Sequence, residues 1–231
     1  LPLPKVVAFF GALLTAAGSI FEHFRFRPDQ ARSVMLVVAI AGSYFLGSSQ
    51  LGANAGGTLA FAGGAWMAYL WLDPSKLQWR EITRSLMIGV AVLLMVVVTD
   101  FRLSNSSSHI GRALGLTAQL GLQVVLGILQ RKANMNLKLL RYSQWSRVLL
   151  MLIMAFCAVF FGPYRHRLQL QRKYPLLTAC LRGALVAAIL ALIANDSGVV
   201  AAATALLYPT ALLILLVLSF SNNNGALISK K

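Results

Sequence analysis

Long runs of apolar residues alternate with short polar stretches along almost the whole chain. Most runs approach the roughly 20 apolar residues that a helix needs to cross a bilayer. The pattern predicts an all-α, polytopic bundle of transmembrane helices that forms a single integral membrane domain over residues 1–231. About seven spans are expected on this criterion, at 6–21, 33–51, 55–72, 85–99, 148–161, 176–194 and 199–220.

One segment differs, because polar residues recur along it at helical spacing while the other positions are almost all Leu, Ile, Val and Ala. The polar positions are Arg112, Gln119, Gln123, Gln130, Asn134, Lys138 and Arg141. They predict an amphipathic helix over about 109–141 that lies flat in the membrane interface. A break in this helix near Ala133 is compatible with the pattern. The alternative is that 113–130 spans the membrane with its glutamines facing the bundle interior. The interfacial helix is favoured because the stripe continues past any membrane-length window.

Small residues recur at every fourth position from the link between the second and third expected spans into the third span. They are Gly52, Gly56, Ala60 and Gly64, which share one helical face and allow another helix backbone to approach closely. A phosphate-binding glycine loop would need a Lys followed by Ser or Thr at fixed spacing, and neither is present. The stripe therefore predicts helix packing.

Composition excludes a water-soluble domain. The 231 residues are 58% hydrophobic and 12% charged, whereas soluble domains carry about 25% charged residues. The formal charge of +15 comes from basic residues clustered between apolar runs, where they act as topology signals and contact anionic lipid headgroups. We therefore expect membrane lipids as partners and no nucleic acid.

The distribution of basic residues predicts an orientation. Seven spans place thirteen of the 21 Lys and Arg residues on one side and eight on the other. The positive-inside rule then puts the N-terminus outside and the C-terminus in the cytoplasm. If 113–130 also spans, the split becomes eleven against ten, so seven spans are preferred.

Polar residues of two connections are expected together at the outer end of the bundle. This candidate outer-face cluster contains Asp100, Arg102, His109, Arg112, Asn195, Asp196 and Ser197. Ionisable groups at the membrane edge are candidates for function, although such residues also serve as turns and caps. No catalytic residue can be assigned. The three histidines lie in three different connections, so no metal site is expected, and no cofactor is implied.

Three segments resemble the C-terminal membrane region of a poorly characterised family of bacterial multi-pass membrane proteins. They are Ser-Ser-Ser-His-Ile-Gly-Arg at 106–112, the basic segment at 131–147, and Asn-Asp-Ser-Gly-Val-Val-Ala-Ala-Ala-Thr at 195–204. The resemblance implies an upstream extracytoplasmic domain similar to the alkaline phosphatase superfamily, whose metal ligands are not in this chain. A start without Met agrees with this expectation of a longer protein.

These observations favour a non-enzymatic anchoring or scaffold domain in the bacterial cytoplasmic membrane. It would bind lipid or a lipid-linked substrate at its outer face. The alternative is a transporter or lipid-handling membrane enzyme that uses Asp100, His109, Arg112 and Asp196.

Overall fold

The described part of the chain is helical. The computed structural model describes residues 3–47, 55–74, 79–80, 83, 87, 122–160 and 170–228. Within these ranges the regular elements are helices and there is no strand, which confirms the all-α expectation for this part of the chain. The helices are α1 (Leu3–His23), α2 (Pro28–Gly47), α3 (Ala55–Leu72), α6 (Leu122–Tyr142), α7 (Gln144–Phe160), α9 (Pro175–Ala194) and α10 (Gly198–Ile228).

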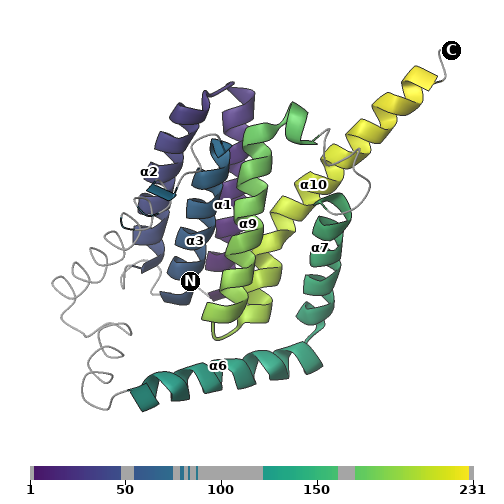
Figure 1. Ribbon diagram of the computed structural model, residues 1–231. Helices are drawn as coiled ribbons and strands as arrows, with labels where there is room; N and C mark the ends of the chain where they lie inside the picture. The colour runs from purple at the N-terminus through teal and green to yellow at the C-terminus, as the bar shows by residue number, and fades with distance from the viewer. Residues whose placement is uncertain are drawn as a thin grey trace.

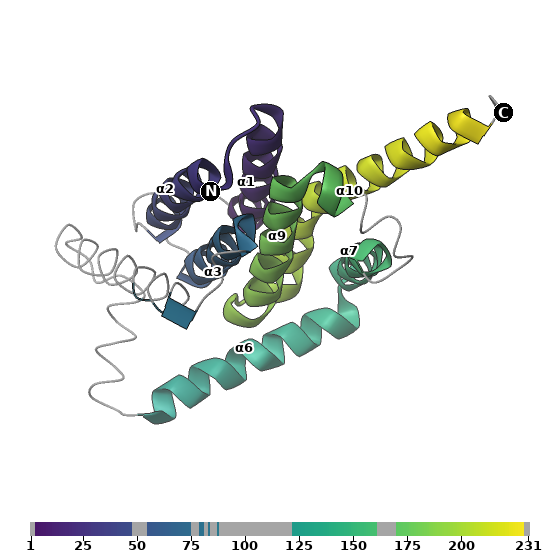
Figure 2. The same cartoon turned by 45° about the horizontal axis from the view of Figure 1, so that its top comes forward.

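Five helices stand side by side as a bundle, and α6 lies across one end of it (Figures 1 and 2). The bundle consists of α1, α2, α3, α9 and α10, and α7 rises from the end of α6 to pack against α10. We call the end that carries α6 and the α9–α10 turn the α6 end. The opposite end carries the turn between α1 and α2.

A carboxylate joins two distant helices at the opposite end. The Oε1 atom of Glu22, near the end of α1, accepts hydrogen bonds from the backbone nitrogens of Leu176 at 2.6 Å and Leu177 at 3.1 Å. These are among the first nitrogens of α9, which lack partners inside the helix. Glu22 therefore caps α9 and fixes α1 antiparallel to it.

Small residues bring α3 and α9 into backbone contact, and this pair forms the most extensive helix contact described. A Cβ atom on Gly64 would lie 2.6 Å from the carbonyl oxygen of Gly183, and one on Gly183 would lie 2.6 Å from that of Gly64. Gly56 and Ala60 belong to the same face, and Ala60 is fully buried. The predicted packing stripe is confirmed for these residues, whereas Gly52 lies outside the described ranges.

The described ranges contain fewer candidate spans than expected. Three helical segments are long and apolar enough to cross a membrane: Pro28–Gly47, Pro175–Ala194 and Gly198–Phe220. A fourth would be the pair Gln130–Tyr142 and Gln144–Phe160, which is bent by 87°. The count of seven is therefore not reached, and the expected span 85–99 lies outside the described ranges apart from Met87.

The expected spans 6–21, 55–72 and 148–161 coincide with α1, α3 and α7 but are not among these candidates. Helices α3 and α7 differ from the candidates in composition and length. Helix α3 contains four glycines. Helix α7 has 17 residues, about 26 Å at 1.5 Å per residue, which is shorter than the roughly 30 Å hydrocarbon core.

Two expected boundaries also differ. Helix α2 begins at Pro28 rather than residue 33, because proline is well suited to the first turn of a helix. Helix α10 continues through Pro209 and past residue 220 to Ile228.

Candidate functional site

The most distinctive feature of the structure is the placement of α6. It lies across the α6 end and meets α7 at 87°. At this elbow the Ser143 hydroxyl oxygen accepts a hydrogen bond from the Trp145 backbone nitrogen at 3.2 Å, and the Ser146 hydroxyl donates to the Leu139 carbonyl at 2.8 Å. The two serines thus satisfy backbone groups that the helix ends leave open.

The amphipathic helix predicted at 109–141 is therefore present from Leu122 onward and ends at Tyr142. It is continuous through Ala133, so the helix has no break there. The alternative of a span over 113–130 finds no support in its described portion, because 122–130 belongs to the helix that lies across the bundle end. Residues 109–121 lie outside the described ranges.

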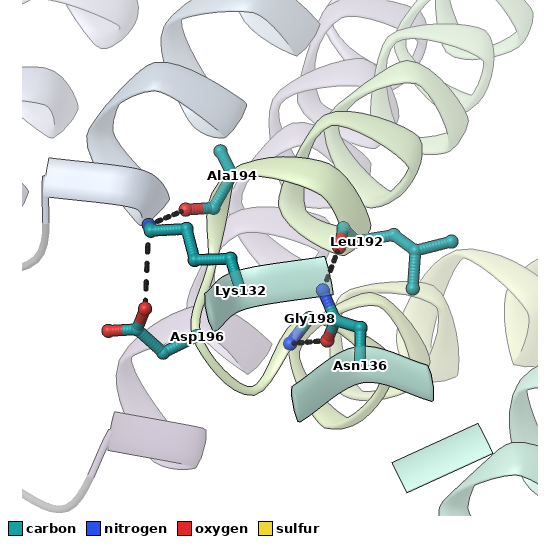
Figure 3. Close-up of polar contacts among 6 residues, drawn as sticks. All are labelled: Lys132, Asn136, Leu192, Ala194, Asp196 and Gly198. Atoms are coloured by element: carbon teal, nitrogen blue, oxygen red, sulfur yellow. Dashed lines mark hydrogen bonds and ion pairs between the residues drawn. The ribbon is translucent and has the colours of Figure 1, made fainter. Parts of the chain in front are cut away.

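Asn136 fastens α6 to the turn between α9 and α10 (Figure 3). Its side-chain nitrogen donates to the carbonyl oxygen of Leu192 at 2.9 Å. Its side-chain oxygen accepts from the backbone nitrogen of Gly198, also at 2.9 Å. One amide thus pairs with a carbonyl near the end of α9 and with the first nitrogen of α10, both of which helix geometry leaves open.

Lys132, one turn earlier on the same face of α6, makes a second attachment (Figure 3). Its Nζ atom donates to the carbonyl oxygen of Ala194 at 2.5 Å and lies 3.6 Å from a carboxylate oxygen of Asp196. Its side chain is 23% exposed, whereas that of Asp196 is 72% exposed. A cation at the carbonyl end of α9 is favourable because that end carries partial negative charge. We call Lys132 and Asn136 with their turn partners the α6 clamp.

The clamped turn also packs against α3. Asn195 is buried, and its backbone nitrogen donates to the carbonyl of Ala191 at 3.1 Å. A Cβ atom on Gly56 would lie 2.6 Å from the Ala194 carbonyl oxygen and 3.0 Å from Oδ1 of Asn195. The absence of a side chain at Gly56 lets the start of α3 press against this turn, so the turn is held from two sides.

The face of α6 turned away from the clamp carries a shallow, open depression, which we call the hollow. It is lined by Gly127, Gln130, Arg131, Asn134, Met135 and Lys138. At 100° per residue, Asn134 and Lys138 point about 160° away from Asn136. Helix α6 therefore has two polar faces, one turned to the bundle end and one lining the hollow.

The predicted outer-face cluster is only partly described. Asp100, Arg102, His109 and Arg112 lie outside the described ranges. Asn195, Asp196 and Ser197 form the α9–α10 turn, where Asp196 is near Lys132. Within the described residues, no three His, Cys, Asp or Glu side chains gather as they would around a metal ion.

Sequence reasoning missed Lys132 and Asn136 as members of a site. They do not belong to the main polar stripe, which was the only polar face considered on this helix. Their spacing of four residues would have identified them, because it places two polar side chains on one otherwise apolar face of the helix.

The clamp is suited to attachment, because the Lys132 ammonium and the Asn136 amide both bond to backbone groups of the α9–α10 turn. The hollow offers two cations and two amides to a ligand. Compared with known proteins, the chain matches no family model, no curated protein and no solved structure.

Proposed function

We propose that this chain is a membrane-embedded anchoring domain of a bacterial envelope protein, with α6 lying in the outer interface of the cytoplasmic membrane. The observation that carries the proposal is the α6 clamp, which holds an amphipathic helix across the end of an apolar bundle. An amphipathic helix lies in the interface plane with its apolar residues among acyl chains. Leu126, Leu137 and Leu140 of α6 are exposed and available for that contact.

The membrane-spanning part includes α1 and α3 in this proposal, although neither is among the three candidate spans. Both pack against α9, which does qualify. Since these helices lie side by side, they share its depth in the bilayer. A bundle that shields part of a helix from lipid tolerates a less apolar composition there. In this proposal the chain crosses the membrane seven times. The crossings are α1, α2, α3, α7, α9, α10 and the expected span 85–99.

Arginine–aromatic contacts at the opposite end are typical of the second membrane–water interface. The guanidinium of Arg32 lies 4.3 Å from the centroid of the Tyr69 ring. That of Arg182 lies 5.8 Å from the Trp71 ring and 5.6 Å from the Phe160 ring. Tyr and Trp concentrate at headgroup level, and an arginine over an aromatic face retains a favourable cation–π contact there.

The proposed orientation places the α6 end outside. Described basic residues at the opposite end include Arg25, Arg27, Arg172 and Lys173. Over the whole chain, this side of the membrane receives thirteen of the 21 Lys and Arg residues. The positive-inside rule therefore assigns this end to the cytoplasm. Helix α1 starts at the α6 end, so an upstream extracytoplasmic domain of the kind that the family resemblance implies would join the bundle on the side of α6.

Cysteine labelling in intact cells tests this proposal. In a background with Cys157→Ala and Cys180→Ala, single cysteines are introduced at Tyr142 on the α6 end and at His23 on the opposite end. Both positions are exposed. A membrane-impermeant maleimide should label Tyr142→Cys in intact cells and His23→Cys only after the cells are opened. The reverse pattern overturns the orientation, and release of the protein from membranes by alkaline carbonate overturns the anchoring function.

A further inference from the structure

We infer that the hollow on α6 binds the phosphate group of an anionic membrane lipid, held mainly by Arg131 and Lys138. The inference rests on the proposed function, because that function places α6 at the level of lipid headgroups. It goes further by naming the ligand and the residues that recognise it. The hollow is distinct from the α6 clamp, since its lining residues are on the other side of the helix.

The lining chemistry fits a phosphate. Arg131 and Lys138 are two turns apart on one helical face, about 10 Å along the axis, and both are exposed. Gln130 and Asn134 add amide nitrogens to the same lining. Cationic nitrogens make short, charge-assisted hydrogen bonds with phosphate oxygens. The hollow is open, so a headgroup can reach these side chains while the rest of its lipid stays in the membrane.

The electrostatic balance around the hollow favours an anion. Of the described residues, Arg131, Lys132, Lys138 and Arg141 bring positive charge to α6. Asp196, a carboxylate of the nearby turn, is beside Lys132 on the clamp side. Among the described residues, no ion pair to a carboxylate occupies Arg131 or Lys138. Both cations are therefore available to an incoming phosphate.

Apolar groups next to the hollow favour a lipid over a soluble phosphate. Met135 belongs to the lining, and Leu126 and Leu137 are 64% and 50% exposed on the same helix. A ligand with a phosphate and acyl chains satisfies both kinds of surface, whereas inorganic phosphate would leave the apolar one bare. Because the clamp fixes α6 by its other face, the hollow is already presented to the headgroup layer.

Lipid titration of the purified full chain tests the inference. Phosphatidylglycerol is added to the protein in neutral detergent, and bound lipid is counted by native mass spectrometry. The test variant combines Arg131→Gln and Lys138→Gln. The control combines Arg147→Gln and Arg172→Gln, which remove the same charge outside the hollow. Each basic residue near an anionic surface contributes about a fivefold gain in affinity, so the test variant should bind about 25-fold more weakly and the control should change less than threefold.

The outcomes separate the possible ligands. The charge-preserving pair Arg131→Lys and Lys138→Arg should retain binding, which rules out a packing defect as the cause of the loss. Equal losses in the test and control variants, or no loss in either, overturn the site. Displacement of phosphatidylglycerol by micromolar inorganic phosphate would assign the hollow to a soluble phosphate and overturn the lipid. None of these results depends on membrane orientation, so a failed labelling experiment and a failed lipid experiment remain distinguishable.

Discussion

The side-chain oxygen of Asn136 lies 2.9 Å from the backbone nitrogen of Gly198, so a residue of α6 closes the first turn of α10. The same side chain donates to Leu192 at the end of α9. A single amide thus ties the crossing helix to both helices of a hairpin. The following predictions test this attachment and the contacts that hold the bundle together.

Asn136→Leu should detach α6 from the bundle. Leucine has a similar volume but offers neither a donor nor an acceptor, so two hydrogen bonds are lost and two backbone groups lose their partners. We expect the free energy of unfolding to fall by about 2 kcal/mol, measured as a lower thermal midpoint in detergent. Asn134→Leu, on the exposed opposite face, is the control and should change stability by less than about 0.5 kcal/mol. Similar losses in both variants would show that the clamp does not hold α6.

Lys132→Met should cost more than Asp196→Asn. The lysine donates to the Ala194 carbonyl at the end of α9 and is mostly buried, whereas Asp196 is 72% exposed and lies 3.6 Å away. Hydrogen bonds from charged donors contribute about 1.5–3 kcal/mol, but exposed ion pairs contribute about 0–1 kcal/mol. Denaturant unfolding of the two single variants and the double variant measures the separate contributions of the hydrogen bond and the ion pair to stability. A larger cost for Asp196→Asn would contradict this assignment.

Glu22→Ala should loosen the junction of α1 and α9. The variant leaves the backbone nitrogens of Leu176 and Leu177 without their acceptor, at an expected cost of about 1–2 kcal/mol. Glu22→Gln keeps an acceptor oxygen but loses the charge at the positive end of α9, so it should cost less. Hydrogen exchange of the first turn of α9 is the direct measurement. Unchanged exchange in Glu22→Ala would show that the cap is unimportant.

Gly64→Val should push α3 away from α9. The new side chain would meet the Gly183 carbonyl, which is 2.6 Å from the position of its Cβ atom, and Cβ of Ala187, which is 2.4 Å from it. Overpacking of this kind typically costs about 1–3 kcal/mol. Gly127→Ala is the matched control, because nothing lies within 4 Å of its Cβ position, and alanine should stabilise α6 by about 0.5–1 kcal/mol. Opposite signs of the two shifts in thermal midpoint would support this packing.

The helices themselves follow from local pattern. Apolar run length located α1, α3, α7, α9 and α10 to within a few residues at most ends. In an apolar surrounding a single segment can satisfy its own backbone hydrogen bonds only as a helix. The continuous polar stripe from Gln123 to Arg141 identified α6 as amphipathic, and the spacing of Gly56, Ala60 and Gly64 indicated close packing. Each of these signals lies within one helix and repeats with its period.

The attachments between helices were decided by tertiary structure. Lys132 and Asn136 bond to groups 56 to 62 residues away, and Glu22 bonds to nitrogens 154 and 155 residues away. In each case the partner is a backbone group at a helix end, which every residue type possesses and which no sequence pattern marks. Only the fold determines which helix ends lie near these side chains, and therefore which polar residues become attachments and which remain available to a ligand.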